Sequence, residues 1–397
     1  MRTPLGNLIL AAIAAALCGF FLHPQGFVVF FGLLVVTALG LSWPWLSVWG
    51  LGGSLAFDRT RCRELETVTA RLTLRNRMPW GVWGLGLKVA DEDGPEALLT
   101  ALVFVPGWRT TSVTFEFASR CRGVYPRTPP RIVCGFPFGL WEASRTLAVP
   151  ETLLVWPRTF PVAPLPELAG GHLSEGLAPR DRAGTWGDPM GVRPYRRGDP
   201  LRRVHWAQTA RHGQLIICEV QSHASPRVQI FLDASRASHP STGADGSREW
   251  SIRVAASMVE SWMGQGAEVD LILDDNRDGG RGLSSKSGLG NLLDALARWE
   301  PCDDAMLRRD LSESRCVDGA FRVIITTDRG FETGCVSVLG PGPSGTRLVV
   351  LLADGFPRGR AGRDLDSPLL SPWAVLTGPD QVASSLRRLG KEVPLGV

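Results

Sequence analysis

Two long apolar segments precede any regular alternation of apolar and polar positions. Residues 5–22 carry no charged side chain, and after HPQG a second apolar run covers 27–41 and is followed by WPWLSVWGL. Each run is close to the about 20 residues that an α-helix needs to cross a bilayer. We therefore predict a transmembrane helical hairpin over residues 1–52. The alternative is a cleaved signal peptide, but its apolar region would be shorter, and a second apolar run would not follow so soon.

The residues that flank the apolar runs predict their orientation. Trp43, Trp45 and Trp49 suit the membrane–water interface, where an aromatic ring finds both apolar and wet surroundings. Arg2 precedes the first run, and the HPQG turn has no cation. Several arginines follow the second run: Arg59, Arg61, Arg63, Arg71, Arg75 and Arg77. Because cytoplasmic flanks are enriched in Lys and Arg, we expect a multi-pass protein of the inner cell membrane with a cytoplasmic soluble body.

Short alternating segments dominate residues 58–158. VTARLTLRN, GLGLKVAD, ALLTALVFV and TSVTFEFAS are separated by Gly, Pro, Asn and Asp. Period-two alternation with such turns is typical of an antiparallel β-sandwich. The region has no pair of acids, nucleophile or ligand cluster that suggests chemistry. A structural or interactive role is therefore expected for this β-rich domain.

Apolar strands alternate with amphipathic helices over residues 227–397. The expected strands are RVQIFLD, AEVDLIL, FRVIITTD, TRLVVLLAD and WAVLTG, and the expected helices are REWSIRVAASMVESWM, LGNLLDALARW and DQVASSLRRL. Apolar strands separated by helices predict parallel βαβ units in a doubly wound α/β sheet. Residues 159–226 connect the two regions, and the Pro-, Gly- and Ala-rich part at 160–186 is expected to lie over the surface as a strap.

The connector ends in a segment rich in Arg, His and Trp, VRPYRRGDPLRRVHWAQTARHGQLIICEV. Its pattern predicts a Gly-Asp turn, a short helix and a strand. We expect Asp199 to cap the helix, because a carboxylate accepts hydrogen bonds from the unpaired N–H groups of a first turn. Trp206 is expected to bury its ring. Arg193, Arg202 and Arg211 offer guanidinium forks to carboxylates, either of this chain or of a partner.

This segment closely resembles the signature of the domain of unknown function 58 family, R-x-Y-x-x-G-D-x-x-R-x-[IV]-x-W-x-x-x-A-R. The signature positions are filled, in order, by Arg193, Tyr195, Gly198, Asp199, Arg202, Val204, Trp206, Ala210 and Arg211. Upstream, CRGVYPRTPPRIVCGFPFGLWE is similar to the family's Arg-Gly and Pro-Phe-Gly-Leu segment. Gly135-Phe136 stands where many relatives have an Asp, and Ala207 stands where Lys is frequent.

The resemblance implies an architecture and a partner. It implies an N-terminal membrane hairpin, a β-rich region and a von Willebrand factor A-like domain. It also implies partnership with a MoxR-type AAA+ ATPase in the assembly or maturation of other proteins. No residue of the chain indicates by itself where such an ATPase would bind.

A degenerate metal motif follows from the same resemblance. Von Willebrand A domains can hold a divalent cation with D-x-S-x-S, a Thr from a later loop and an Asp after the fourth strand. Asp233 and Ser235 match the first part, Ala237 replaces the second Ser, and IITTD supplies Thr327 and Asp328. The candidate middle-loop ligands are Ser284, Ser285 and Ser287. Oxygen ligands at the carboxyl ends of strands suit Mg²⁺. Alternatively, Asp233 caps a helix and Asp328 turns a loop without an ion.

Composition narrows the possible functions. Hydrophobic residues form 44% of the chain and charged residues 21%, which predicts a folded protein. The net charge of +4 is small and no basic stripe with interleaved aromatics occurs, so nucleic acid is not an expected partner. The eight Cys form no C-x-x-C motif and have no His at ligand spacing, which favours reduced structural thiols.

We therefore expect a non-enzymatic, membrane-anchored adaptor or scaffold whose A-like domain binds protein. One alternative is an envelope-facing structural or adhesion protein that binds its ligand through a divalent cation. The tripeptide Arg197-Gly198-Asp199 does not favour it, because it lies inside the signature. Another alternative is an unrecognised hydrolase using Cys218 with His205 or His223, although no nucleophile motif surrounds that cysteine.

Overall fold

The chain folds into two compact units. The structure is a computed structural model, and it describes residues 4–89, 97–165, 189–196, 199, 201–220, 226–233, 236, 238–241, 243–273, 283–300, 320–332, 346–356 and 372–389. The first unit spans Met1–Pro157 and the second spans Arg158–Val397. The division lies beside the end expected for the β-rich domain, residue 158.

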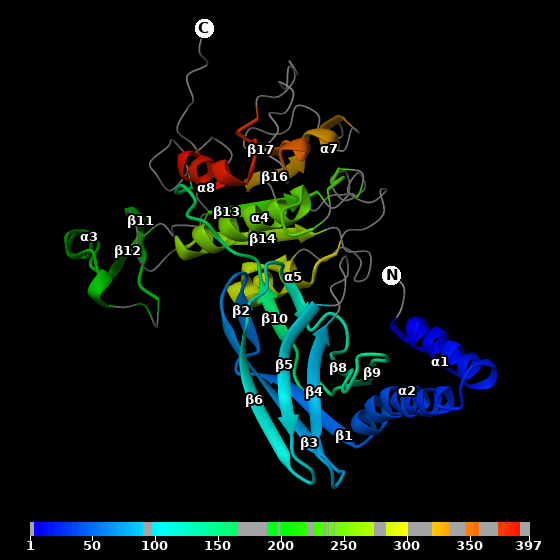
Figure 1. Cartoon of the computed structure of the whole chain (residues 1–397). Coiled ribbons are helices and arrows are strands. Elements are labelled where there is room, and N and C mark those ends of the chain that lie inside the picture. The colour runs from blue at the N-terminus through cyan, green and yellow to red at the C-terminus, as the bar shows by residue number, and fades with distance from the viewer. Residues whose placement is uncertain are drawn as a thin grey trace. The chain divides into compact units, whose positions relative to one another are not determined.

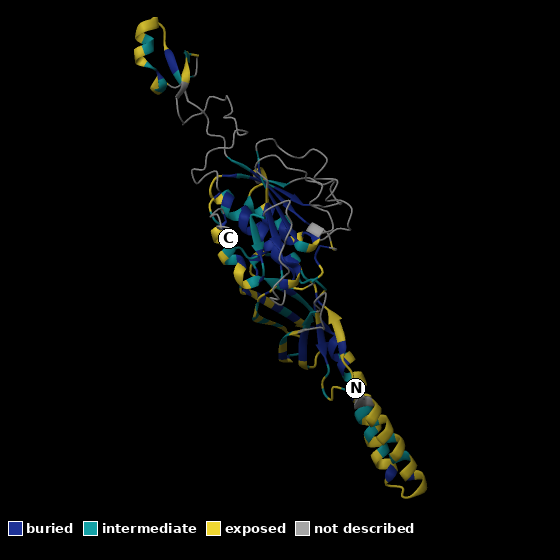
Figure 2. Cartoon of the chain, turned by 90° about the horizontal axis from the view of Figure 1, so that it is seen from above, coloured by how far each residue is buried: buried dark blue, intermediate teal, exposed yellow. Residues whose placement is uncertain are grey.

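The first unit begins with two helices, α1 (Pro4–Phe21) and α2 (Gly26–Trp49), which pack side by side (Figure 1). Their backbones approach closely at Gly19 and Gly26. A Cβ added at Gly26 would lie only 2.3 Å from the backbone nitrogen of Gly19. Most of the outer surface of the pair is apolar and exposed (Figure 2). Among the described residues, only α2 is long and apolar enough to cross a membrane. One candidate anchor is thus present, and a second span stays a prediction.

Ten strands follow in the first unit: β1 (Leu51–Phe57), β2 (Arg61–Arg63), β3 (Val68–Asn76), β4 (Val82–Val89), β5 (Ala97–Val105), β6 (Thr110–Phe117), β7 (Gly123–Tyr125), β8 (Arg131–Cys134), β9 (Ala143–Thr146) and β10 (Leu153–Trp156). They form sheets ordered β1-β3-β6, β5-β4-β8-β9 and β2-β10-β7.

The predicted alternation explains how these strands build a core. Along β3, Ala70, Leu72 and Leu74 are buried while the intervening positions are partly or fully exposed. The strand pairs of these three sheets are antiparallel, except that β2 and β10 run parallel. β1 lies before residue 58, where the β-rich domain was expected to begin. Its sequence LGGSLAF hides the alternation, because two glycines occupy consecutive positions.

The second unit contains a six-stranded sheet ordered β15-β14-β13-β16-β17-β18. Its strands are β13 (Arg227–Leu232), β14 (Glu268–Leu273), β15 (Leu283–Ser284), β16 (Phe321–Thr327), β17 (Thr346–Leu351) and β18 (Ala374–Leu376). The helices around it are α4 (Ser247–Gly264), η2 (Ser285–Ser287), α5 (Leu289–Arg298), α7 (Asp328–Glu332), η4 (Ala353–Gly355) and α8 (Pro379–Arg388). All pairs in this sheet are parallel except β14 with the edge strand β15.

Apolar burial and strand order together single out the carboxyl ends of the central strands β13 and β16. β13 and β16 are buried along almost their whole length, as continuous apolar runs predict for a sheet covered on both faces. The order reverses between them, because β14 lies on one side of β13 and β16 on the other. Open α/β sheets bind ligands beyond the carboxyl ends of strands at such a reversal. The residues that follow β13 and β16 are therefore candidates for a site.

The expected strap is described up to residue 165, and this part packs on α4. Phe160 N–H donates to Ser257 Oγ at 2.9 Å, and the Trp262 indole N–H donates to the Ala163 carbonyl at 3.2 Å. The Arg158 guanidinium lies 4.6 Å from the centre of the Trp250 ring, in cation–π geometry. The rest of the predicted strap lies outside the described residues.

Candidate functional site

The family-like signature forms a local hairpin within the second unit, which we call the signature hairpin (residues 189–220). β11 (Pro189–Pro194) pairs antiparallel with β12 (Ile216–Val220), and η1 (Leu201–Arg203) and α3 (Trp206–His212) lie between them. Val204, Ile216 and Ile217 are buried, and Val204 forms a β-bridge with Ile217. These aliphatic side chains supply the hairpin's small core.

A bidentate ion pair braces the turn of the hairpin. Arg193 on β11 donates from Nη1 to Asp199 Oδ2 at 2.7 Å and from Nη2 to Asp199 Oδ1 at 2.9 Å. The Arg196 N–H donates to the same carboxylate at 2.8 Å. These bonds, chiefly the one from Arg193, lower the pKa of Asp199 to about 2. The signature's first Arg and its Asp therefore hold each other in place.

This pairing corrects the prediction that Asp199 caps the following helix. His205 is the residue that caps α3, since its Nδ1 accepts the Gln208 N–H at 3.2 Å. The carboxylate is engaged by Arg193 because β11 brings that guanidinium across the turn. The single predicted helix is also split into η1 and α3, because Val204 leaves the helix to bridge Ile217.

Trp206 departs most from expectation. We predicted a buried ring, but 70% of the residue's surface is exposed at the start of α3. Leu201, Val192 and Leu215 of the same hairpin are also exposed. The buried positions of the hairpin are taken by Val204, Ile216 and Ile217 instead. The signature thus presents a large aromatic side chain instead of hiding it.

The other signature residues have local placements. The Tyr195 N–H donates to the Leu215 carbonyl at 2.8 Å, which extends the β11–β12 pairing. Arg202 lies within η1, and Arg211 lies in the last turn of α3. Gly198 lies outside the described residues.

The proposed hydrolase pair gains no support from these contacts. Cys218 lies on β12 opposite Val192. His205 uses Nδ1 to cap α3, a structural task. His223 lies outside the described residues.

A second candidate site lies at the reversal of strand order. Asp233 directly follows β13 and is 1% exposed, and its Oδ2 accepts a hydrogen bond from Thr326 Oγ1 of β16 at 2.6 Å. Asp328 follows β16, as predicted from the strand pattern. Its Oδ1 accepts the N–H groups of Arg329 at 3.0 Å and of Ala353 at 2.8 Å. This Asp therefore fixes the loop after β17.

Three oxygen atoms converge beside Gly330 of α7. A Cβ built on Gly330 would lie 2.4 Å from Asp233 Oδ2, 2.4 Å from Thr326 Oγ1 and 2.8 Å from Ser238 Oγ. Ser238 is fully buried, and its hydroxyl has no hydrogen-bond partner among the described residues. A carboxylate and two hydroxyls are hard oxygen donors, the kind that Mg²⁺ and Ca²⁺ prefer. Sequence reasoning named Asp233 but missed Ser238 and Thr326.

The remaining predicted ligands lie elsewhere or engage other groups. Thr327 Oγ1 donates to the Ser238 carbonyl at 2.6 Å and accepts the Gly330 N–H at 3.1 Å. Ser284 and Ser287 lie at β15 and η2. Ser235 and the side chain of Ser285 lie outside the described residues. Within the described part of the chain, no three His, Cys, Asp or Glu side chains gather as metal ligands.

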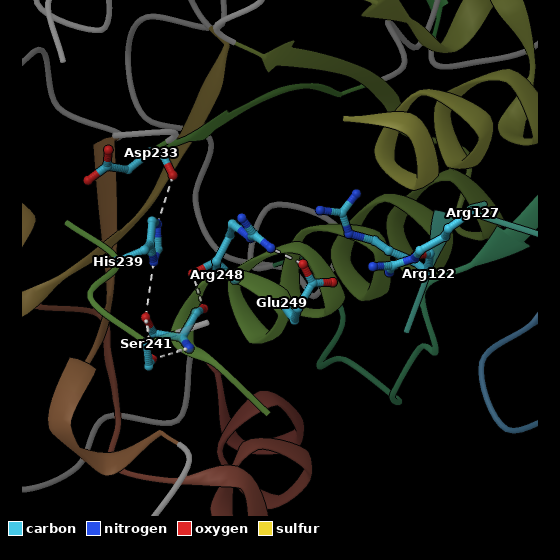
Figure 3. Close-up of polar contacts among 9 residues, drawn as sticks. Arg122, Arg127, Asp233, His239, Ser241, Arg248 and Glu249 are labelled. Atoms are coloured by element: carbon cyan, nitrogen blue, oxygen red, sulfur yellow. Dashed lines mark hydrogen bonds and ion pairs between the residues drawn. The ribbon is translucent and has the colours of Figure 1, made fainter. Parts of the chain in front are cut away.

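A buried histidine supports the Asp233 loop. The Nε2 of His239 lies 3.0 Å from the Asp233 carbonyl oxygen (Figure 3). Its Nδ1 lies 3.2 Å from Ser247 Oγ. Ser241 Oγ accepts the Ser247 N–H at 3.1 Å. Burial lowers the pKa of His239, and the nearby negative charge of Asp233 only partly opposes this. His239 is therefore neutral near pH 7 and links the loop to α4.

Three solved structures show weak likenesses to the chain. One is to the CARDB domain of PF1109 from Pyrococcus furiosus, at 12% identity over 27% of this chain and 94% of that chain, with a TM-score of 0.18. Another is to a superoxide reductase (neelaredoxin) from Ignicoccus hospitalis, at 18% identity over 24% and 79%, with a TM-score of 0.17. A third is to an exo-β-N-acetylglucosaminidase from Vibrio harveyi, at 11% identity over 73% and 60%, with a TM-score of 0.20.

Sequence comparison is more informative over one region. No curated protein matches the chain. Residues 191–312 match the family described as "Protein of unknown function DUF58". The match begins at β11, includes the whole signature from Arg193 to Arg211 and extends beyond α5. Over residues 191–312, the chain thus carries the sequence pattern of the DUF58 family, as the signature had indicated.

Proposed function

We propose that this protein is a membrane-anchored adaptor that binds other proteins and does not itself catalyse a reaction. In this proposal α1 and α2 cross the inner cell membrane, and both soluble parts face the cytoplasm. The α/β sheet of the second unit is von Willebrand factor A-like, and the signature hairpin binds a MoxR-type AAA+ ATPase. The exposed Trp206 on a braced hairpin is the observation that carries the proposal.

An indole in this position suits a protein contact. Burial of a tryptophan at an interface removes a large apolar area from water while its N–H keeps a polar partner. Tryptophan is accordingly among the residues that dominate binding energy in protein interfaces. The Arg193–Asp199 pair and the His205 cap fix the backbone on both sides of Trp206. A side chain held on such a support loses less conformational freedom when a partner binds.

The test is affinity capture of the intact protein from detergent-solubilised membranes, with ATP and Mg²⁺ present, followed by mass spectrometry. The Trp206→Ala variant removes the proposed contact. The Trp83→Ala variant is the matched control, because it removes another exposed indole (44%) from the first unit. We expect an AAA+ ATPase with the intact protein and the control, and its loss with Trp206→Ala. Equal recovery with all three proteins, or no ATPase with any, would overturn the proposal.

The oxygen cluster at the sheet edge favours a second candidate, a protein that binds an envelope ligand through a divalent cation. Asp233, Ser238 and Thr326 would hold the ion, and the ion would supply a Lewis-acidic point for a ligand carboxylate. A topology reporter fused after Val397 separates the two functions. An ATPase partner requires a cytoplasmic position for this end, whereas an envelope ligand requires the opposite side.

A further inference from the structure

In the first unit, turns of the β-rich region surround the last turn of α2. The Arg77 N–H donates to the Gly50 carbonyl at 3.0 Å, and the Met78 side chain packs against Gly50, where an added Cβ would lie 2.2 Å from Met78 Cγ. The Arg145 guanidinium of β9 donates to the carbonyls of Val48 and Trp49. A cation on the last carbonyls stabilises a helix end. The β-rich region is thus fastened to the end of the membrane-anchoring helix.

The loop between β8 and β9 reaches further along α2. A Cβ added at Gly40 would lie 2.5 Å from Leu140 Cδ1 and 3.4 Å from Phe138 Cδ2, so both side chains pack on the helix at this glycine. Gly40 lies nine residues before Trp49, which corresponds to about 13 Å along the helix axis. If α2 enters the bilayer, this loop lies beside a stretch of helix that is within it or at its surface.

Exposed aromatic side chains gather on these same elements. We call them the aromatic rim: Trp45, Trp49, Trp108, Phe136, Phe138 and Trp141. The rings of Trp45 and Trp49 stack with centroids 6.1 Å apart. Trp108 belongs to the turn at Gly50, because its N–H donates to the Met78 carbonyl at 2.9 Å. Large apolar side chains exposed together mark an interaction surface, and aromatic rings prefer the membrane interface.

The charges near the rim are mainly cationic. Arg77 and Arg109 are exposed in the turns beside Trp108, and Arg75 is exposed near the end of β3. The exposed acid beside Trp141, Glu142, is paired with Lys88 at 2.7 Å. Exposed cations at a membrane surface attract anionic lipid headgroups. Aromatic side chains and exposed arginines at the end of an apolar helix are together complementary to an anionic bilayer surface.

We infer that the β-rich region rests on the bilayer itself, with the aromatic rim in the headgroup layer and these arginines on anionic lipids. The inference rests on the proposed anchoring by α2 and adds a second membrane contact, made by a β-domain. The region is then held in a fixed orientation against the membrane rather than hanging from a flexible tether.

The test places a genetically encoded fluorescent amino acid at one of three exposed positions in the intact protein, held in nanodiscs that contain anionic lipid. Phe138 reports the rim, Leu34 reports the middle of α2, and Asp58 is the control, since the seven residues of β1 lead about 23 Å away from the helix. Lipids that carry a quencher at the headgroup or deep in the acyl chain locate each label. We expect headgroup quenching at Phe138, deep quenching at Leu34 and none at Asp58.

Two other outcomes are distinguishable. Deep quenching at Leu34 with no quenching at Phe138 would keep the anchor but overturn the membrane-resting rim, and a protein partner would then be the expected cover for these rings. No quenching at Leu34 would overturn the anchoring by α2 and the inference together. Exchange of anionic for zwitterionic lipid should weaken quenching at Phe138 and leave that at Leu34 unchanged.

Discussion

Gly330→Ala tests whether the oxygen cluster at the sheet edge is as closely packed as described. The new Cβ would lie 2.4 Å from both Asp233 Oδ2 and Thr326 Oγ1, which themselves form a 2.6 Å hydrogen bond. Loss of a hydrogen bond to a charged group costs about 1.5–3 kcal/mol. Overpacking of a buried site adds about 1–3 kcal/mol. Replacement of a helical Gly by Ala returns only about 0.5–1 kcal/mol. A net loss of about 2–5 kcal/mol is therefore expected.

The assay is urea unfolding of the intact protein in detergent, followed by tryptophan fluorescence. Gly264→Ala is the matched control, because Gly264 ends α4 and an added Cβ would meet no heavy atom within 4 Å. The control should be neutral or more stable by up to about 1 kcal/mol. If Gly330→Ala were as stable as the unaltered protein, the convergence of Asp233, Thr326 and Ser238 around this glycine would be refuted.

Three further predictions concern titratable groups. In the folded protein, burial holds the pKa of His239 below its ordinary value of about 6.5. Below pH 6.5 the unfolded chain therefore binds more protons than the folded protein, and stability should fall as the pH drops from about 7.5 to about 5.5. An unfolding midpoint constant over that range would contradict this. Asp199→Asn should speed amide hydrogen exchange across β11–β12. In the unaltered protein, the stabilisation from the Arg193–Asp199 ion pair is fully present above pH 3.8 and should be lost as the pH falls through about 2. Protection equal in both proteins at pH 7 would argue against a bracing ion pair. Burial raises the pKa of Cys62 to about 11, so alkylation at pH 8 should be slow until urea unfolds the protein. Equal rates with and without urea would refute its burial.

The sequence predicted elements well where apolar patterns were long. β13, β14, β16 and β17 were all expected from continuous apolar runs, and the adjacency of β13 and β16 brings Asp233 near Thr326. β15 was missed because two residues are too few to show a period. β1 was missed because two glycines interrupt its apolar positions. Local pattern is informative only over several residues.

The site was predictable in residue identity but less so in geometry. The signature identified Arg193 and Asp199, yet their pairing depends on how β11 lies across the turn. Trp206 was expected inside, because an apolar ring usually is, but the structure buries Val204, Ile216 and Ile217 and leaves the indole exposed. Ser238 and Thr326 join Asp233 through tertiary contacts between separate strands and loops. Spacing along the chain does not carry that information.

The central claim is that the signature hairpin binds a AAA+ ATPase through Trp206. The most direct measurement is the affinity of the captured ATPase for the intact protein in nanodiscs, compared with Trp206→Ala and Trp83→Ala. Because a hot-spot tryptophan contributes about 2 kcal/mol or more, Trp206→Ala should weaken binding by about 30-fold or more, and Trp83→Ala should leave it unchanged. Equal affinity for all three proteins would contradict the account.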